Sequence, residues 1–324
     1  MLKKPFWIAL CILQLAWFTG QGQIASWSSF RWGHDSITVN KQKAFVPKSA
    51  LFLPVSFDGD PRRYYMQLDL GSDVPLLLYA TPTCIDNKNV AHTAYDTNPV
   101  NKCFRVNYPL KGRIGQDSFA LDSAHYCLMR RKGDTSTNYT MPSTTSPIIG
   151  TIGLSYFLKK ILVLDFTHEQ FILLNDTFKV PERFAKAKFY VPSHIRNSRF
   201  IVPIEYADTT FNDFFYETGS SIFDLVVSKK LWCKMTGKTG AEPDNFKVTV
   251  NTWGHQLNAI GAHPKTPIRV NNFYLPTALV FYIPEDEDFK DTYGSNGMVG
   301  NSPFFSKVIV LDFIRNRFGV FTAL

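Results

Sequence analysis

The stretch that decides the fold is GTIGLSYF at residues 150–157, which recurs as GMVGNSPF at residues 297–304. The likeness continues downstream, where ILVLDF at residues 161–166 is matched by VIVLDF at residues 308–313. Every matched pair is 147 residues apart, without a gap. A repeat of this kind indicates two copies of one structural unit within the chain.

A second repeated block lies upstream of each copy. LPVSF at residues 53–57 resembles VPIEY at residues 202–206, and each is followed by a turn and another apolar segment. Those segments end in DLGS at residues 69–72 and in ETGS at residues 217–220, which are 148 residues apart. The two halves are therefore copies of one fold, each with an acidic residue shortly before a glycine and a serine.

The local patterns predict a mainly β protein. Segments such as residues 64–68 and 212–216 are short, rich in aromatic and apolar residues, and bounded by turn residues, as strands are. Hairpin turns are expected at residues 58–61 and 207–210. Because 324 residues exceed what one simple core usually supports, we expect two β-rich lobes.

The expected domain organisation follows from the repeat and from the first residues. We divide the chain into a signal peptide at residues 1–22, an N-terminal segment at 23–45, an N-terminal lobe at 46–180 and a C-terminal lobe at 181–324. Helix periodicity is confined to short stretches, near residues 154–160 and 228–235.

An acidic residue, then Leu or Thr, then Gly-Ser, once per half, resembles the paired Asp-Thr-Gly motifs of the pepsin-like (A1-type) aspartic proteases. The resemblance covers nearly all of the chain from about residue 46, because TIG at 151–153 and MVG at 298–300 also resemble segments that pack behind each catalytic loop in that family. It implies a bilobal fold with two pseudo-symmetric β-rich lobes and a central cleft. Asp69 and Glu217 are then the candidate catalytic pair.

The chemistry of two facing carboxyls supports this assignment. Peptide hydrolysis without a metal or a covalent intermediate needs one carboxylate to accept a proton from water and a partner to protonate the substrate carbonyl. Two close carboxyls share one proton, so one apparent pKa falls and the other rises. Gly71 and Gly219 would let the loops approach without a Cβ in the way. Ser72 and Ser220 could hydrogen-bond the outer carboxylate oxygens.

Three features depart from the family pattern. Glu217 replaces an aspartate, and its extra methylene moves the carboxylate by about 1.5 Å. Leu70 replaces a threonine that would hydrogen-bond across to the other loop, whereas Thr218 keeps its half of that clasp. The hairpin that covers the substrate resembles residues 111–117, but the expected Tyr-Gly pair is missing, and Tyr108 is the nearest candidate for a substrate-facing tyrosine.

Composition and charge limit the partners. The chain carries a formal net charge of +8, which falls to +6 without Lys3 and Lys4 of the leader. Its basic residues are scattered rather than gathered in one run, so we expect no nucleic-acid partner. Neither the cysteines nor the seven histidines show a metal-ligand spacing, and we expect no metal and no other cofactor. The expected partner is a polypeptide in extended conformation, bound by a monomer.

The first residues predict export. Lys3 and Lys4 precede an apolar run at residues 6–18, which the small-x-small triplet at residues 20–22 follows. The alternative is an uncleaved membrane anchor, but the run is short for a bilayer span and Gln14 interrupts it. We expect cleavage, no stable membrane insertion, and a secreted, periplasmic or extracellular protein. Too few residues separate the leader from the first strand for a full inhibitory propeptide.

Cysteine usage agrees with export but leaves the pairing open. Four cysteines remain after cleavage of the leader, an even number that makes disulfides plausible. Four cysteines allow three connectivities, and a local bridge between Cys84 and Cys103 is one option. Free buried thiols are the alternative.

Three functions remain open at this stage. The first is a secreted aspartic-type endopeptidase, the second a pepsin-fold pseudoprotease that binds peptides or proteins without cleaving them, and the third an unrelated cell-surface β protein. The first two predict a pepsin-like cleft, and they differ in whether Asp69 and Glu217 can share a proton.

Overall fold

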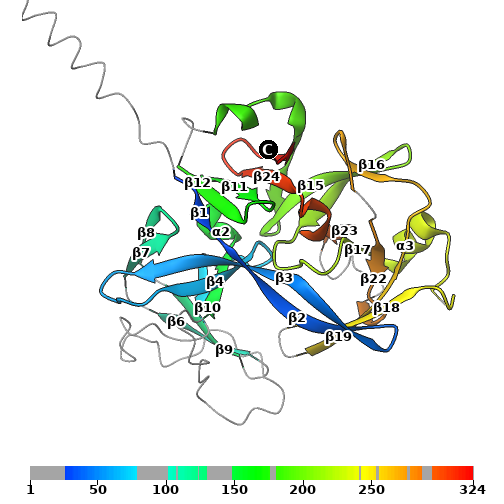
Figure 1. Ribbon diagram of the computed structural model, residues 1–324, viewed down its shortest axis with the longest axis horizontal. Helices are drawn as coiled ribbons and strands as arrows, with labels where there is room; N and C mark the ends of the chain where they lie inside the picture. The colour runs from blue at the N-terminus through cyan, green and yellow to red at the C-terminus, as the bar shows by residue number, and fades with distance from the viewer. Residues whose placement is uncertain are drawn as a thin grey trace, which may run out of the picture.

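The protein is described here by a computed structural model, which places residues 26–78, 101–106, 109–122, 124–129, 148–175, 180–240, 242–252, 255–275, 278–286 and 294–323. The predicted signal peptide lies outside the described residues. The described chain is mostly strand, and the two halves lie on either side of a shared sheet (Figure 1). No helix in these ranges has the length and apolar character needed to cross a bilayer.

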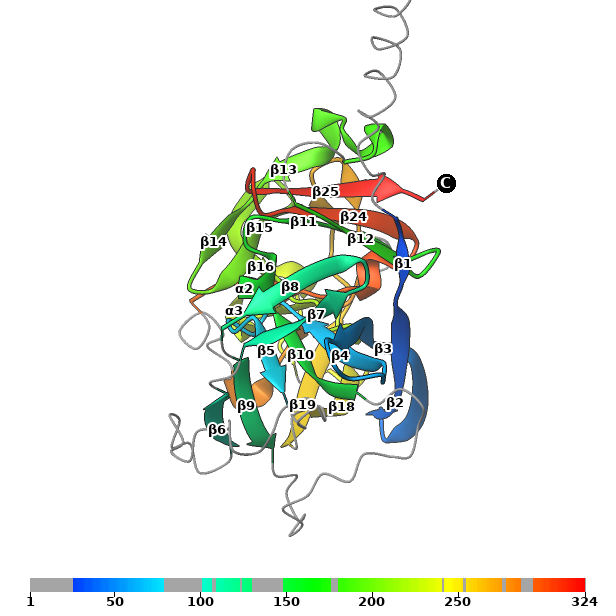
Figure 2. The ribbon, with the colours of Figure 1, turned by 90° about the vertical axis from the view of Figure 1, so that its left-hand side faces the viewer.

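The shared sheet has six strands and joins the two halves (Figure 2). Its central pair, β11 (Ile161–Asp165) and β24 (Lys307–Asp312), consists of the repeated segments, and Val163 lies opposite its own counterpart Val310. The pseudo-twofold axis therefore passes through this pair. The flanking strands, in the order that the sheet gives them, are β12 (Gln170–Leu174) and β1 (Ser28–Ser29) on one side, and β25 (Arg317–Thr322) and β13 (Tyr190–Pro192) on the other.

Each half contains the same strand arrangement around its acidic loop. In the N-terminal half, β10 (Ile148–Gly153) pairs in parallel with β4 (Tyr64–Asp69) and antiparallel with β5 (Leu76–Leu78). In the C-terminal half, β23 (Gly297–Val299) pairs in the same two ways with β16 (Thr209–Tyr216) and β17 (Leu225–Val227). β10 and β23 begin the repeated sequences, in agreement with the prediction of two copies of one fold. The mainly β fold with two matching halves is therefore confirmed.

The remaining strands complete the two halves as a larger sheet. In the N-terminal half they are β3 (Gln42–Phe57), β6 (Asn101–Val106), β7 (Leu110–Ile114), β8 (Asp117–Leu121) and β9 (Ala124–Met129). In the C-terminal half they are β14 (His194–Arg196), β15 (Arg199–Tyr206), β18 (Phe246–Thr252), β19 (His255–Ala262), β20 (Ile268–Val270), β21 (Phe273–Tyr274) and β22 (Val280–Tyr282).

A long ribbon made of β2 (Arg31–Val39) and β3 crosses from one half to the other, as Figure 1 shows. Its outer strand pairs with β18 of the C-terminal half, where Val39 lies opposite Val248. At the tip, the backbone of Asn40 donates to the Lys247 carbonyl, and the Asn40 side chain accepts from the Lys247 backbone, both at 2.8 Å. The N-terminal segment thus links both halves directly.

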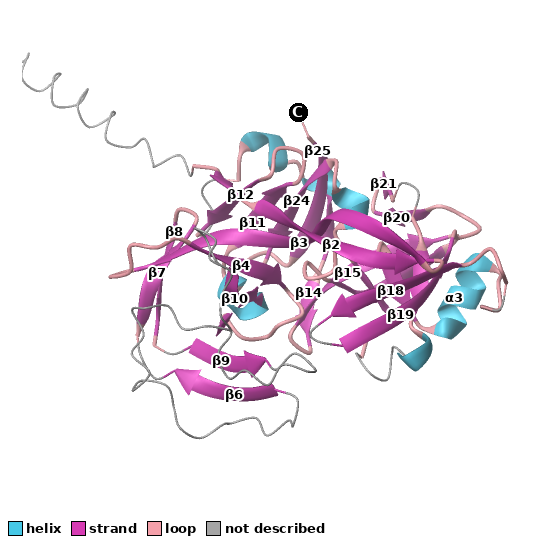
Figure 3. Cartoon of the chain, turned by 60° about the horizontal axis from the view of Figure 1, so that its bottom comes forward, coloured by secondary structure: helices cyan, strands magenta, loops and turns pink. Residues whose placement is uncertain are grey.

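In the part of the chain that the structure describes, helices are few and short (Figure 3). The two stretches predicted from periodicity form α2 (Leu154–Phe157) and α3 (Lys229–Thr236). Ser228 caps the start of α3 by accepting a hydrogen bond from the Leu231 backbone, and Gly237 ends it in the left-handed conformation that favours glycine. Single 3-10 turns lie at Glu182–Phe184 (η2), Ala187–Phe189 (η3), Pro284–Asp286 (η4) and Ser302–Phe304 (η5).

The cysteines do not resolve the disulfide question. Cys233 on α3 is a free thiol. Backbone pairing places Cys103 of β6 opposite Cys127 of β9, but their side chains, like all of Cys84, lie outside what the structure describes. The disulfide expectation stays a prediction.

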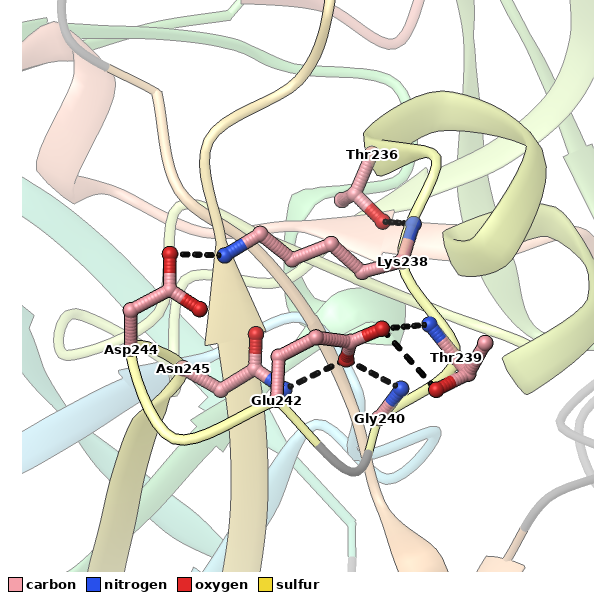
Figure 4. Close-up of polar contacts among 7 residues, drawn as sticks. All are labelled: Thr236, Lys238, Thr239, Gly240, Glu242, Asp244 and Asn245. Atoms are coloured by element: carbon pink, nitrogen blue, oxygen red, sulfur yellow. Dashed lines mark hydrogen bonds and ion pairs between the residues drawn. The ribbon is translucent and has the colours of Figure 1, made fainter.

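The turn after α3 is organised by one exposed carboxylate, Glu242 (Figure 4). It accepts hydrogen bonds from the Thr239 backbone at 2.7 Å, the Gly240 backbone at 2.9 Å and the Asn245 amide at 3.2 Å. These donors, led by Thr239, lower the pKa of Glu242 to about 2. The ionised carboxylate is therefore the form that holds the turn.

The stability of this turn is expected to depend on the ionised form of Glu242. A lowered pKa stabilises the folded form above the unfolded pKa of 4.5, and that contribution is lost as pH falls through 4.5 to about 2. Glu242→Gln should release the Thr239 and Gly240 backbone N–H groups at pH 4 to 6, which faster amide exchange would report. Equal exchange rates in the variant and the parent chain would contradict this assignment.

Candidate active site

The two acidic residues occupy matching positions at the ends of matching strands. Asp69 is the last residue of β4, and Glu217 directly follows β16. Each begins a tight turn of the same kind, because the Ser72 backbone donates to the Asp69 carbonyl at 3.1 Å and the Ser220 backbone donates to the Glu217 carbonyl at 3.2 Å. The structure therefore brings the two predicted loops to equivalent places.

The two loops meet, and their carboxyls interact directly. The Gly71 backbone N–H donates to Asp69 Oδ1 at 3.0 Å and to Glu217 Oε1 at 3.2 Å. The Gly219 N–H donates to Glu217 Oε1 at 2.8 Å. The Gly71 N–H therefore lies between the two carboxyls, and each carboxyl influences the pKa of the other. The pair is thus held by two backbone donors.

The glycines are required by close approach. A Cβ on Gly71 would lie 2.1 Å from Glu217 Oε2, and a Cβ on Gly219 would lie 3.0 Å from Asp69 Cγ. Distances under 3 Å between such atoms force a displacement. The expectation that glycine opens space for the facing carboxyls therefore agrees with the geometry, and the contact at Gly71 is the tighter one.

Burial raises the pKa of both acids. Burial raises the pKa of Glu217 well above its usual value, and the charge of Asp69 adds to the rise. Burial also raises the pKa of Asp69, although the hydrogen bond from Glu217 and the Gly71 N–H oppose it. Both pKa values are raised, so burial favours retention of a proton by the pair.

Of the two reciprocal hydrogen bonds expected between the acidic loops, one is formed. The Leu70 backbone donates to Thr218 Oγ1 at 2.9 Å, and both side chains are buried. This is the half of the clasp that the sequence analysis expected Thr218 to retain. Leu70 has no hydroxyl with which to return the bond. A further link across the loops, not anticipated from sequence, is the Gln67 amide, which donates to the Gly219 carbonyl at 3.4 Å.

The loops rest on the glycines of the repeated segments. Gly153 and Gly300 each lie against backbone carbonyls of the acidic loop, so that an added Cβ would come within 2.6 Å of Ser72 O and 2.5 Å of Ser220 O, respectively. Ser72 O accepts from the Leu154 backbone at 2.8 Å, and Ser220 O accepts from the Asn301 backbone at 2.9 Å. The same support is built twice.

The serines act through their backbone groups. Their hydroxyls were expected to bond the outer carboxylate oxygens, but no such bond is formed among the residues that the structure describes. The Ser72 backbone instead helps to oppose the rise in the pKa of Asp69. The reason is geometric, since the turn directs the N–H of the third residue after the acid back toward it.

A buried polar network supports the Glu217 loop and was missed from sequence. Asn301 donates to the Thr218 carbonyl and to Ser221 Oγ, both at 2.8 Å, and accepts from the Tyr216 hydroxyl at 2.5 Å. Its side chain is fully buried. The signal was present as a break in the repeat, where Asn301 stands in place of Leu154.

Arg199, at the start of β15, is a second residue that sequence reasoning missed. Its guanidinium stacks on the Phe215 ring at 4.5 Å, two residues before Glu217. Its positive charge lowers the pKa of both Asp69 and Glu217, against the larger effect of burial. Arg199 therefore favours ionisation of the pair.

Replacing Arg199 with methionine is expected to raise the apparent pKa values of the pair. Loss of a nearby cation removes stabilisation of the ionised carboxyls, so any activity governed by their ionisation should shift toward higher pH. A pH profile of the variant beside Arg196→Met, which changes the arginine paired on β14, measures the shift. A downward shift, or the same shift in both variants, would contradict the assignment.

The two predictions about the substrate-covering hairpin have different outcomes. Tyr108 lies outside the described residues, and its substrate-facing role stays a prediction. The hairpin at residues 111–117 is formed by β7 and β8, but its turn is not over the acidic loops. Gly115 lies against Phe171 of β12 and Ser28 of β1, both in the six-stranded sheet. The expectation for residues 111–117 is therefore wrong, because this turn packs on the shared sheet.

Comparisons with known proteins find similarity among solved structures. No protein-family model and no curated protein matches the chain. Among solved structures, an aspartic proteinase from Irpex lacteus matches with 12% identity and a TM-score of 0.48, over 90% of this chain and 98% of that one. The Basic 7S globulin from soybean matches with 10% identity and a TM-score of 0.44, over 91% of this chain and 95% of that one. The site itself is defined by the contacts described above.

Proposed function

We propose that this protein is an aspartic-type endopeptidase in which Asp69 and Glu217 activate water for the hydrolysis of peptide bonds. The observation that carries the proposal is the meeting of the two carboxyls at the ends of matching loops, where the Gly71 N–H donates to both. Gly71 and Gly219 provide the space, and Thr218 fixes the distance between the loops. The predicted leader supports export as the setting.

The proposed mechanism assigns different roles to the two acids. Asp69, as the carboxylate, accepts a proton from water while the water oxygen attacks the substrate carbonyl. Glu217, as the protonated acid, gives its proton to the carbonyl oxygen, so that a neutral tetrahedral intermediate forms. Asp69 then gives its newly acquired proton to the leaving nitrogen while Glu217 takes a proton from a hydroxyl of the intermediate. The C–N bond breaks, the two peptides are released, and both acids return to their starting forms. Efficient transfer needs both groups within hydrogen-bond reach of the reacting atoms.

The substrate would be a polypeptide in extended form. Backbone pairing in a cleft between β-rich lobes recognises extended chains with little dependence on sequence. The raised pKa of Glu217 extends the singly protonated state of the pair toward higher pH. Activity should therefore persist above the usual titration range of a carboxyl and be lost when Glu217 ionises.

A pseudoprotease that binds peptides is the second candidate, and one observation favours it. Glu217 is longer than aspartate, and its Oε2 lies against the Gly71 backbone, at 2.1 Å from the position of an added Cβ. A carboxyl folded onto the opposite loop occupies space that a bridging water needs. Misplacement of about 1 Å can cost on the order of a hundredfold in rate. The same fold would then retain binding without hydrolysis.

The deciding experiment is digestion of a denatured protein mixture between pH 2 and 8, with new peptide termini identified by mass spectrometry. The purified chain is compared with Glu217→Asp, which restores the shorter acid, and with Asp69→Asn, which removes the base. If the protein is an endopeptidase, we expect cleavage by the parent chain, equal or greater cleavage by Glu217→Asp, and none by Asp69→Asn. If none of the three proteins cleaves the mixture, the result would favour the pseudoprotease.

A further inference from the structure

A concave pocket of about 430 Å³ lies between residues 183–189, called the linker below, and the six-stranded sheet. None of its lining residues belongs to either acidic loop. The linker contributes through η2 and η3, the C-terminal half through the β20–β21 hairpin, and the sheet through the ends of β24 and β25. The lining residues are Arg183, Phe184, Lys186, Phe189, Val270, Asn271, Asn272, Phe273, Lys307, Val320, Phe321 and Thr322.

The pocket has an aromatic wall whose rings hold one another in place. Phe321 packs edge-on against Phe184, with ring centroids 5.2 Å apart, and against Phe189 at 5.3 Å. On the other side, Phe273 packs on the buried Phe304 at 5.9 Å. This arrangement offers rigid apolar area to a ligand.

The charged groups of the pocket all have one sign. Arg183, Lys186 and Lys307 contribute three cations, and no acidic side chain is among the lining residues. Arg183 lies over the Phe184 ring at 4.4 Å and Lys307 over the Phe273 ring at 5.2 Å, so these two cations contact the aromatic wall. Cations above an apolar pocket match a ligand with an acidic group on an apolar body.

Hydrogen bonds fix the rim. The Asn271 amide donates to the Lys188 carbonyl at 2.9 Å and so ties the β20–β21 hairpin to the linker. The Tyr190 hydroxyl donates to the Phe184 carbonyl at 2.7 Å. A rim fixed before binding reduces the entropy cost of holding a ligand.

We propose that this pocket binds a small organic anion, with one acidic group and an aromatic or aliphatic body. The volume lies within the usual range for small-molecule sites, the aromatic wall would take the body, and Lys186, Lys307 and Arg183 would take the acidic group. This inference does not depend on the protease proposal, because it uses different residues and a different ligand class.

A pair of fluorescent dyes that differ only in the acidic group tests the proposal. The probes are 1-anilinonaphthalene-8-sulfonate and the neutral N-phenyl-1-naphthylamine, each titrated into the full chain at low and high salt. We expect saturable binding of the sulfonate that weakens with salt. The double variant Lys186→Gln/Lys307→Gln should weaken it by roughly tenfold, because charge-assisted contacts are lost. The neutral dye should be little affected.

Two further variants separate the pocket from other surfaces. Thr322→Trp, at the exposed rim, keeps every charge but fills the space, and it should also weaken binding of the sulfonate. Arg113→Gln removes an exposed cation on β7 outside the pocket and should change nothing. Unchanged binding in both pocket variants, or equal weakening in Arg113→Gln, would overturn the proposal. Thermal melting of each variant verifies that it is folded.

Discussion

Asp69→Asn is expected to lower the rate of peptide hydrolysis by on the order of 10² to 10⁴, because a positioned general base contributes about that much. An asparagine amide cannot accept the proton of the attacking water. It can still accept the hydrogen bond from the Gly71 N–H through its oxygen, so the loop geometry should be retained. The loss should therefore appear in kcat and leave substrate affinity nearly unchanged. Steady-state kinetics on a peptide substrate measure both quantities.

The matched control for this prediction is Asp208→Asn. Asp208 is an exposed aspartate in the two-residue turn between β15 and β16, far along the strand from Glu217, and the change removes the same charge. It should leave kcat unchanged. Activity retained by Asp69→Asn would mean that cleavage comes from another site or from a contaminating protease.

Gly71→Ala is expected to reduce hydrolysis by on the order of a hundredfold through displacement of Glu217, since a shift near 1 Å in a reacting group costs about that much. The added Cβ would stand 2.1 Å from Glu217 Oε2, and the loop has little room to yield because the neighbouring Leu70 backbone is bonded to Thr218. The same change breaks the direct contact between the carboxyls. The pH profile should therefore move as well as the rate.

Gly219→Ala provides the comparison, because its Cβ would meet Asp69 and Glu217 atoms at 3.0 Å rather than 2.1 Å. We expect a smaller loss of rate in this variant. A loss in Gly219→Ala equal to or larger than that in Gly71→Ala would show that backbone distortion, rather than displacement of Glu217, governs the effect.

Much of the fold was predictable from the sequence because the internal repeat indicates two matching halves. The 147-residue offset between residues 161–166 and 308–313 places equivalent strands at the axis, and Val163 does lie opposite Val310. The turn expected at residues 207–210 is shorter than predicted, since β16 already begins at Thr209. Positive φ at Ala207 completes that turn in two residues, which the polar composition of the segment did not reveal.

The support of the site was less predictable because it depends on contacts between residues distant in sequence. Asn301 and Arg199 carry no motif, and only the contacts with Thr218 and Phe215 identify them. The hairpin at residues 111–117 was misplaced for the same reason, because its Gly-rich turn fits several environments. Its contact with Phe171 in the shared sheet is a tertiary property.

The central claim is that Asp69 and Glu217 share one proton. Carboxyl ¹³C chemical shifts of the two residues, followed by NMR from pH 2 to 9 and assigned with Asp69→Asn and Glu217→Gln, test it most directly. The account predicts that both signals respond in each of two separate steps, with the upper step well above the ordinary range of a glutamate. Two independent titrations near the usual carboxyl values would contradict it.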